Sequence, residues 1–258
     1  MAIQPIIFYD IPSKAPGVAW SPNTWRIRYA FNYKGLPYKT EWVEYPDIKE
    51  LYMRLEIGPC QILKSGKPYY CLPVIHNPNT GATISDSARI ADYLDSTYPD
   101  TPTVVPAGTH TLQKTFCVAY DSVMEPLRPY IIPAITTILR PTSEEYYVRM
   151  REASFGKKLP DLVPNGDGHA VAWMAVQDGF GKIDKWMTES GGVPGPFVMG
   201  EVLSFADFAI AGKLQWYKKG FGENSDLWKD VMAWHGGRWA KLLDDLNRFE
   251  GSSEEMRD

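Results

Sequence analysis

A serine at position 21 stands where the sequence predicts the start of a helix, in the stretch Ser21-Pro22-Asn23-Thr24. Serine is favoured at the N-cap and proline at the first helical position. Backbone N–H groups are unpaired at such a terminus and the helix dipole is positive there, so a nearby anion is stabilised. The chemistry that these residues favour is therefore the stabilisation of a negatively charged atom beside Ser21.

A thiolate is an anion that this arrangement can stabilise. A free thiol has a pKa near 8.5, and lowering it by two units requires about 2.7 kcal/mol. A hydrogen bond to a charged acceptor contributes about 1.5–3 kcal/mol, and a helix N-terminus about 0.3–1 kcal/mol. We predict that the Ser21 hydroxyl activates the thiol of a bound peptide, with the Asn23 amide as a second donor. In the simpler alternative, Ser21 only caps the helix and Asn23 is a solvated first-turn residue.

A second helix start is predicted at Ser85-Asp86-Ser87, where a carboxylate and a hydroxyl stand together. The free N–H groups of the helix favour a bound carboxylate, Ser87 adds a hydroxyl donor, and Asp86 can pair with an amine. A ligand that carries both groups on one carbon, the head of an α-amino acid, would suit this pair. The alternative is that Asp86 or Ser87 merely caps the helix.

Pro73 opens a short strand predicted at residues 72–76, with the apolar Leu72 before it. Thioredoxin-like folds place a cis-proline at such a position. Only about 5–6% of X–Pro bonds in folded proteins are cis, so the prediction depends on the neighbouring helix starts rather than on the proline alone. With that context we predict a cis bond between Leu72 and Pro73.

The elements that must position these residues alternate between strand and helix over the first hundred positions. A β-prone run is followed by the helix from Ser21 to Lys34, with Gly35 as its C-terminal stop. The later elements complete the order βαβ, then α, ββ, α, which predicts a small α/β domain at residues 1–98. They are expected at 38–45, from 46, at 72–76, at 82–84 and at 85–94.

Prolines separate this half from the rest of the chain. Three of them between residues 99 and 106 predict an extended linker at 99–107. The remainder, 108–258, is predicted to be an all-helical domain, with long helices near residues 111, 144, 169, 205 and 234. Three further prolines should kink or end the first of these helices: Pro126, Pro129 and Pro133.

An apolar stripe in the second half is a candidate for a hydrophobic-substrate site. Phe116, Tyr120, Met124 and Arg128 recur every four residues and would share one helix face. Such a stripe is more often core than pocket, but the arginine argues for an open end, since it is rarely buried without a partner. An aromatic groove of this kind would suit phenolic or other hydrophobic aromatic molecules. Tyr130, Trp216 and Tyr217 are further candidates.

Composition and charge exclude several classes of function. A formal net charge of −4 and a pI near 5.7 argue against nucleic-acid binding. No apolar run approaches the roughly 18 residues of a membrane span, and the N-terminal residues lack the features of a signal peptide. Cys60, Cys71 and Cys117 form no metal-ligand spacing. We expect a soluble, cytoplasmic protein without a metal, whose thiols are free and in which Cys71 is a buried, inert strand residue.

In the order of these elements, essentially the whole chain resembles the glutathione transferase family. The stretch Trp20-Ser21-Pro22-Asn23-Thr24-Trp25-Arg26, continued by Tyr33-Lys34-Gly35-Leu36-Pro37-Tyr38, is similar to the bacterial β-aryl etherases. It is still more similar to the fungus-specific class A glutathione transferases related to them. Ser204-Phe205-Ala206-Asp207, an S-x-x-D capping box, resembles the N-capping motif of the buried helix in the helical domain of this family. The resemblance implies a thioredoxin-like first domain, glutathione as co-substrate, and a homodimer.

The resemblance also implies roles for individual residues. A serine activates the thiol in this group of transferases, and that place falls on Ser21. Asp86 and Ser87 take the γ-glutamyl head of glutathione, and the backbone of Leu72, before Pro73, pairs with the cysteinyl amide. Position 21 holds no cysteine, which sets the chain apart from the omega-like, deglutathionylating members.

One segment departs from the family pattern. The segment between Tyr45 and Leu72 is longer than in the compact transferase pattern and includes an extra turn at 64–68. Family members usually hold the glycine carboxylate of glutathione from this region. Lys49 is the first candidate for that contact here, with Lys39 and Gln61 behind it.

The sequence thus favours a serine-type glutathione transferase with a role in detoxification. It would conjugate hydrophobic or aromatic electrophiles or reduce peroxides. A second hypothesis is a weakly catalytic or non-catalytic carrier, a ligandin, of aromatic and phenolic small molecules. A third, a relative that kept the fold and lost glutathione, is disfavoured by the presence of Ser21, Pro73, Asp86 and Ser87. Nothing in the sequence separates the first two.

Overall fold

In the computed structural model, which describes residues 4–189 and 195–251, four strands form the main sheet of the first domain. Their order across the sheet is β2-β1-β5-β6, with β1 parallel to β2 and the other neighbours antiparallel. The central strand β1 is almost fully buried, as its unbroken apolar run predicts. The strands are β1 (Ile6–Asp10), β2 (Tyr38–Trp42), β5 (Val74–Asn77) and β6 (Ala82–Ser85).

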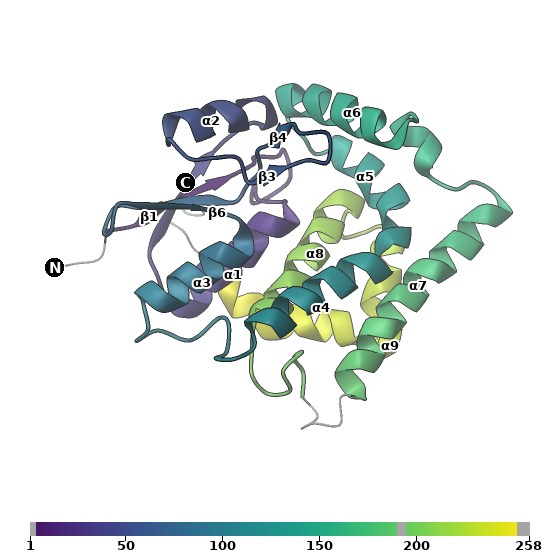
Figure 1. Ribbon diagram of the computed structural model, residues 1–258. Helices are drawn as coiled ribbons and strands as arrows, with labels where there is room; N and C mark the ends of the chain where they lie inside the picture. The colour runs from purple at the N-terminus through teal and green to yellow at the C-terminus, as the bar shows by residue number, and fades with distance from the viewer. Residues whose placement is uncertain (1–3, 190–194, 252–258) are drawn as a thin grey trace.

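Helices cover both faces of this sheet (Figure 1). Helix α1 (Pro22–Lys34) and helix α3 (Ser87–Thr97) lie side by side on the face toward the second domain, and α2 (Ile48–Arg54) lies on the opposite face. Helix α1 ends at the predicted Gly35, which adopts a left-handed conformation with φ 67°. The 3-10 turn η1 (Tyr45–Asp47) precedes α2, so the predicted strand at 38–45 is shorter than expected.

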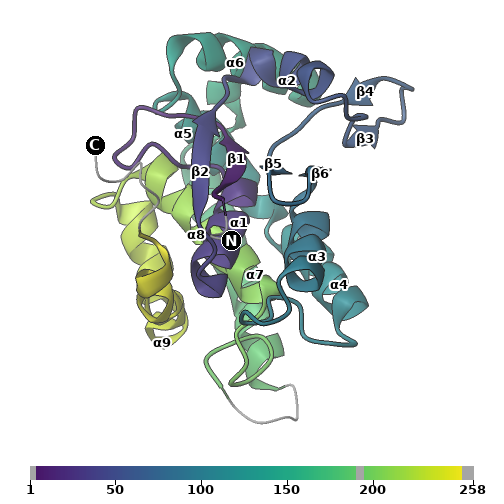
Figure 2. The ribbon, with the colours of Figure 1, turned by 90° about the vertical axis from the view of Figure 1, so that its left-hand side faces the viewer.

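The segment that departs from the family pattern forms a small hairpin. Strand β3 (Gln61–Ile62) pairs antiparallel with β4 (Pro68–Tyr69), and the extra turn at 64–68 connects them. The hairpin stands apart from the main sheet, at one side of the molecule (Figure 2). It leads directly into the bond between Leu72 and Pro73, which is cis as the sequence predicts.

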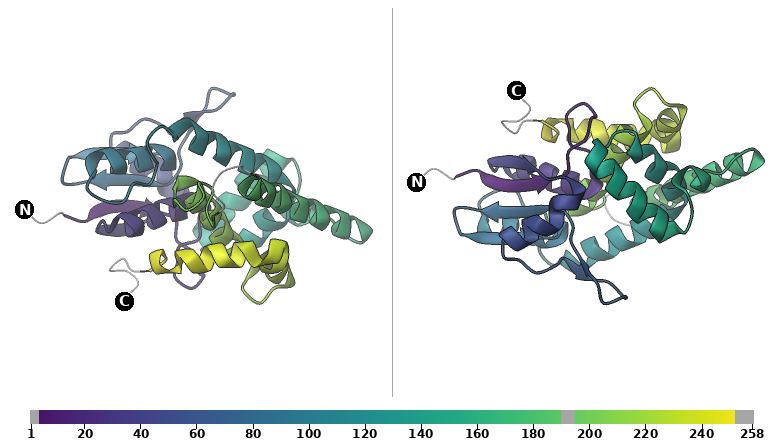
Figure 3. Two further views of the ribbon diagram at one scale, coloured as in Figure 1. Left: turned by 90° about the horizontal axis from the view of Figure 1, so that it is seen from below. Right: turned by 90° about the horizontal axis from the view of Figure 1, so that it is seen from above.

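The second domain is all-helical (Figures 1 and 3), which confirms the predicted combination of an α/β domain with a helical one. Its central helix, α8, is buried along most of its length. No helix within residues 4–189 and 195–251 is long and apolar enough to cross a membrane. The helices are α4 (His110–Val123), α5 (Arg128–Thr136), α6 (Pro141–Phe155), α7 (Asp167–Thr188), α8 (Phe205–Phe221) and α9 (Asp226–Leu246), with short 3-10 turns η2 (Glu125–Leu127), η3 (Leu159–Leu162) and η4 (Asn247–Phe249).

The predicted effect of the prolines on the first long helix is confirmed. Helix α4 ends at Val123, and the turn η2 contains Pro126. Helix α5 then begins with Pro129 in its first turn and accommodates Pro133 in its interior. The chain therefore changes direction just before Arg128, which matters for the apolar stripe discussed below.

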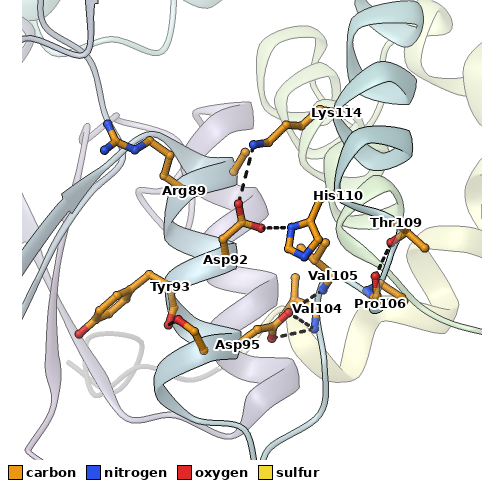
Figure 4. A network of polar contacts seen from close by, with 12 residues as sticks. Arg89, Asp92, Tyr93, Asp95, Val104, Val105, Pro106, Thr109, His110 and Lys114 are labelled. Atoms are coloured by element: carbon orange, nitrogen blue, oxygen red, sulfur yellow. Dashed lines mark hydrogen bonds and ion pairs between the residues drawn. The ribbon is translucent and has the colours of Figure 1, made fainter.

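The linker between the domains is fixed by carboxylates of α3 (Figure 4). Asp95 accepts hydrogen bonds from the backbone N–H groups of Val104, at 3.0 and 3.1 Å, and of Val105, at 2.7 Å. One turn earlier, Asp92 contacts the Nδ1 atom of His110 at 2.8 Å, at the start of α4. Because buried N–H groups need partners, these contacts hold the extended linker in one path between the domains.

Helix α1 is packed against α8 as closely as two backbones allow. A Cβ atom at Gly212 of α8 would lie 2.5 Å from the carbonyl oxygen of Pro22, so only glycine fits there. Further along the interface, the rings of Tyr29 and Phe208 stack with centroids 5.8 Å apart. Gln215 of α8 donates a hydrogen bond of 3.0 Å to the Tyr29 hydroxyl. The second domain thus fixes the position of the helix that begins at Ser21.

Candidate active site

Ser21 is the N-cap residue of α1, as the sequence predicts, but its side chain does not cap the helix. Its carbonyl oxygen accepts from the Trp25 N–H and the Thr24 hydroxyl, both at 3.0 Å. The hydroxyl has no hydrogen-bond partner among the residues that the structure describes, although the side chain is only 5% exposed. The two roles that the sequence left in competition are therefore separated: the hydroxyl is free to donate.

The first turn of α1 offers further unpaired donors beside this hydroxyl. Pro22 has no N–H, and the amides of Asn23 and Thr24 have no acceptor among the described residues. Such groups, together with the positive end of the helix dipole, favour an anion. The Asn23 side chain is exposed and lies at the same cavity as Ser21.

A cavity of about 310 Å³ lies in front of Ser21, between the two domains. Its volume is at the low end of the range found for small-molecule sites. The first domain contributes Trp20, Ser21, Asn23 and Leu72, among others. The helical domain contributes residues of the α4–η2–α5 segment, α6 and α8: Asp121, Met124, Glu125, Leu127, Arg128, Ile131, Ile132, Tyr147, Arg151, Lys213, Trp216 and Tyr217.

The sheet brings the other predicted glutathione residues to the edge beside this cavity. Val74, which follows Pro73, pairs with Ser85 of β6, so the cis bond and the start of α3 are neighbours. Leu72 lies at the cavity itself, whereas Asp86 and Ser87 are not among the residues that line it. The topology therefore gathers all four predicted positions at one end of the sheet.

Asp86 is used differently from Ser21, because its carboxylate does cap its helix. The oxygen Oδ1 accepts from the N–H groups of Ala88, at 3.0 Å, and Arg89, at 3.1 Å. Asp86 is exposed and has φ 80°, a conformation that is uncommon outside glycine. Its second oxygen, Oδ2, and the hydroxyl of Ser87 have no partner among the described residues. Capping and ligand binding are thus compatible at this helix start.

The predicted substrate stripe does not lie on one helix face. Met124 and Arg128 border the cavity, but the end of α4 at Val123 separates them from the first two members. Tyr120 is 1% exposed in the core, and Phe116 packs against Trp186 with ring centroids 6.4 Å apart. Phe116 and Tyr120 do not border this cavity, whereas Met124 and Arg128 do. Of the further candidates, Trp216 and Tyr217 line the cavity and Tyr130 does not.

Lys49 lies at a second cavity, of about 480 Å³. This cavity shares part of its wall with the first one, including Tyr45, Tyr69 and Arg151. Lys39 is in the exposed part of β2 and Gln61 in β3, and neither lines either cavity. Of the three candidates for the glycine carboxylate, Lys49 is thus the one placed next to the site.

Arg151 of α6 is a cation of this shared wall that sequence reasoning missed. Its guanidinium carbon lies 5.1 Å from the centre of the Tyr147 ring. Burial lowers the pKa of Arg151, but the neighbouring phenol groups of Tyr147, Tyr45 and Tyr69 raise it above its usual value. Burial raises the pKa of Tyr147 to about 12, so this phenol is protonated at neutral pH. The wall therefore offers a permanent positive charge among aromatic rings.

Two polar features on the α8 side of the cavity were also missed. Lys213 pairs with Asp121 at 3.0 Å and lies 5.3 Å from the centre of the Trp216 ring. Burial lowers the pKa of this lysine although Asp121 raises it. The indole nitrogens of Trp20 and Trp216 are buried and have no hydrogen-bond partner among the described residues. Both residues line the cavity, but their N–H groups are covered by neighbouring atoms.

Cys71 departs from its expectation. It lies outside the regular strands, is only partly buried, and lines the cavity beside Leu72. Over the described ranges, no group of three or more His, Cys, Asp or Glu side chains is arranged to hold a metal ion.

Comparison with known proteins identifies relatives over both domains. The chain matches the model of the glutathione S-transferase N-terminal domain at residues 20–97 and that of the C-terminal domain at residues 111–249. It is 32% identical to the glutathione S-transferase-like protein ustS of Aspergillus flavus, over 98% of this chain and 94% of that protein.

Solved structures agree with these matches. The glutathione S-transferase CsGST63524 of Ceriporiopsis subvermispora, solved in complex with glutathione, is 45% identical, with a TM-score of 0.92, over 97% of this chain and 100% of that one. The glutathione transferase GSTFuA3 of Phanerochaete chrysosporium is 38% identical, with a TM-score of 0.90, over 98% of this chain and 100% of that one.

Proposed function

The chain belongs to the glutathione S-transferase family, and we propose that it is a serine-type member that activates the thiol of glutathione at Ser21. The observation that carries this proposal is the Ser21 hydroxyl, which is nearly buried at a cavity and makes no hydrogen bond within the described part of the chain. A hydroxyl that faces a cavity and does not cap its helix can donate a hydrogen bond to a bound thiolate.

The proposed chemistry follows from the start of α1. The Ser21 hydroxyl and the free amides of the first turn stabilise the thiolate over the thiol, so the pKa of bound glutathione falls. The sulfur then attacks an electrophilic carbon, a new carbon–sulfur bond forms, and a leaving group or π-electron pair is displaced. Asn23 acts as a second donor to the sulfur.

The rest of glutathione would be held at the neighbouring sheet edge. The Leu72 backbone pairs with the cysteinyl amide, and Asp86 and Ser87 hold the γ-glutamyl head. This assignment is supported by the unpaired Oδ2 of Asp86 and hydroxyl of Ser87. We assign the glycine carboxylate to the cationic side of the shared wall, with Lys49 and Arg151 as its partners.

The second substrate would occupy the helical-domain side of the cavity. Met124, Trp216 and Tyr217 supply apolar and aromatic surface, and Arg128 stands half-exposed at the rim, paired with Glu125 at 3.0 Å. An aromatic, partly polar wall of this kind suits hydrophobic aromatic molecules. We therefore propose hydrophobic or aromatic electrophiles as substrates, a capacity to reduce peroxides, and a role in detoxification. The resemblance to the fungus-specific class A transferases favours the same substrates.

The test is the Ser21→Ala variant. Loss of one hydrogen bond to a charged sulfur should raise the pKa of bound glutathione by one to two units and lower the rate of conjugation about ten- to a hundred-fold. The affinity for glutathione should change little, because the sheet edge still holds the peptide. Thiolate absorbance against pH measures the first effect directly. An unchanged thiol pKa would assign the activation to Asn23 or to the helix terminus alone.

A second candidate function is carriage of aromatic or phenolic molecules with little or no turnover. The tyrosine-lined second cavity, larger than the first, is the observation that favours it. Retention on immobilised glutathione, followed by a panel of model electrophiles and hydroperoxides, separates the two functions. Retention and phenol binding without any turnover would favour the carrier.

We also propose the organisation in which this activity operates. Residues 1–98 form the glutathione-binding domain, 99–107 the linker and 108–258 the substrate domain of a cytoplasmic homodimer. Light scattering at micromolar concentration tests the dimer, and a single monomer mass would contradict it.

A further inference from the structure

Two of the three cysteines meet at the base of the β3–β4 hairpin. In the register of this hairpin Gln61 pairs with Tyr69, so Cys60 stands one residue outside the pairing, beside Tyr70 and Cys71. The Cys60 thiol donates to the carbonyl oxygen of Tyr69 at 3.1 Å. The thiols of Cys60 and Cys71 also hydrogen-bond to each other. The two thiols are therefore neighbours at the base of the hairpin, and both side chains are only partly buried.

The pair borders the candidate active site. Cys71 lines the cavity together with Ser21, and it directly precedes Leu72 and the cis bond to Pro73. The carboxylate of Asp86 is near enough to act electrostatically on both thiols. A molecule bound in this cavity thus lies next to Cys71.

The two thiols are not equivalent. The hydrogen bond from Cys71 lowers the pKa of Cys60 to about 7, against the effect of burial, with a further contribution from the Tyr52 hydroxyl and an opposing one from Asp86. The same hydrogen bond, followed by burial, raises the pKa of Cys71. Tyr52 also donates to the Cys71 carbonyl oxygen at 2.8 Å, which fixes the backbone between the sulfurs. One sulfur is thus suited to attack and the other to hold its proton until the first has reacted.

We propose that Cys60 and Cys71 form a reversible redox pair that reduces glutathione disulfide, an activity separate from the Ser21-dependent one. The Cys60 thiolate attacks one sulfur of glutathione disulfide, the sulfur–sulfur bond breaks, and the first glutathione leaves as a thiolate and takes up a proton. Cys71 then loses its proton and attacks the Cys60 sulfur, which expels the second glutathione. The pair ends as a disulfide and two molecules of reduced glutathione are released. Excess reduced glutathione reverses both steps.

The experiment incubates the full-length reduced protein with glutathione disulfide at neutral pH and follows free thiols and intact mass. We expect the loss of two of the three thiols, a mass lower by two hydrogen atoms, and a peptide map that joins Cys60 to Cys71. Reduced glutathione in excess should restore both thiols. Stable glutathione adducts on separate cysteines, without this disulfide, would overturn the proposal.

Single variants assign the two roles. Cys71→Ser should stop at one glutathione adduct, on Cys60. Cys60→Ser should react with glutathione disulfide at least about ten-fold more slowly than the wild type. The reason is that a thiol with an ordinary pKa near 8.5 is mostly protonated at neutral pH. Cys117→Ser is the matched control: Cys117 is also partly buried, but burial raises its pKa. It should behave like the wild type, and equally fast oxidation of Cys117 in the wild type would count against a special pair.

A last variant separates this proposal from the proposed function. Ser21→Ala should form the Cys60–Cys71 disulfide at the wild-type rate even though its transferase activity falls. If transferase activity is absent from the wild type while the disulfide still forms, only the proposed function fails. If conjugation proceeds and no disulfide appears, only the redox pair fails.

Discussion

Among the helices that begin with a serine N-cap, α1 and α8 use the serine hydroxyl in opposite ways. At the start of α8, the Ser204 hydroxyl donates to Asp207 Oδ2 at 2.8 Å within a reciprocal capping box, and both residues are fully buried. At the start of α1, the Ser21 hydroxyl faces a cavity and has no partner among the residues described. One terminus is closed by the chain itself, and the other is left open.

The two termini differ at the third residue of each helix. Position N3 of α8 is Asp207, whose carboxylate returns to the N-cap, as in a capping box. Position N3 of α1 is Thr24, whose hydroxyl instead bonds to the Ser21 carbonyl oxygen at 3.0 Å. Because no carboxylate at N3 returns to the N-cap of α1, the Ser21 hydroxyl stays open for a ligand. The comparison predicts stability effects at α8 and activity effects at α1.

The largest expected effect is that of Asp207→Ala on stability. Its carboxylate accepts from the Val198 N–H at 2.7 Å and from the Ser204 N–H at 2.9 Å, in addition to the Ser204 hydroxyl. Removing it leaves buried donors without an acceptor, each costing about 1–3 kcal/mol, so the free energy of unfolding should fall by at least about 3 kcal/mol. Urea denaturation measures it. Asp226→Ala, at an exposed first-turn position of α9, is the control and should stay within about 0.5 kcal/mol.

The pH dependence of stability should also reveal the closed terminus. Burial raises the pKa of Asp207 to about 6, although four backbone and side-chain hydrogen bonds oppose it. The folded protein therefore holds a proton that the unfolded chain has lost between about pH 4 and pH 6, so this group makes stability fall as the pH rises through that window. Between about pH 4 and pH 6, the unfolding free energy of the wild type should fall by up to about 3 kcal/mol relative to that of Asp207→Asn. A difference that stays constant from pH 4 to pH 7 would contradict the raised pKa.

Exchanging the two serines for alanine should sharpen the contrast. Ser204→Ala removes a used hydroxyl and should cost about 1–2 kcal/mol of stability, with the pKa of bound glutathione unchanged. Ser21→Ala removes an unused one and should alter stability by less than about 0.5 kcal/mol, while the thiol pKa rises. Urea denaturation and thiolate absorbance on both variants give the four values. Equal losses of stability would mean that the Ser21 hydroxyl does cap α1.

The smallest expected effect is that of Asn23→Ala. Asn23 is exposed at the cavity, so its amide competes with water for the sulfur, and the thiol pKa should rise by less than about one unit. A shift larger than that of Ser21→Ala would reverse the order of the two donors and make Asn23 the main one.

Much of this contrast could be predicted because it depends on residues that are close together in the sequence. The Ser-Pro start of α1, its stop at Gly35 and the capping box at Ser204 all depend on groups within one or two turns. The cis bond before Pro73 was predictable from its position ahead of a strand and beside a helix start.

The rest depends on contacts between distant segments. Arg151 lies on a helix with many charged residues, and its aromatic neighbours Tyr45 and Tyr69 come from the first domain. The meeting of Cys60 with Cys71 needs the hairpin register, which an extra turn of uncertain length does not reveal. The four-residue repeat through Tyr120 does not run along one helix, because α4 ends at Val123 before the repeat reaches Arg128.

The close approach of Gly212 to Pro22 affects whether the two domains can be separated or recombined. With 2.5 Å between a Cβ at position 212 and the Pro22 oxygen, and with Tyr29 stacked on Phe208, helix α1 belongs to two domains at once. A fragment that ends in the linker would leave one side of α1 without its covering, exposing aromatic surface to water. Recombination that joins the first domain to a foreign helical domain would succeed only if the donor carries a glycine at the matching place. The linker is thus a poor crossover point for recombination, although its prolines mark it as a domain boundary in the sequence.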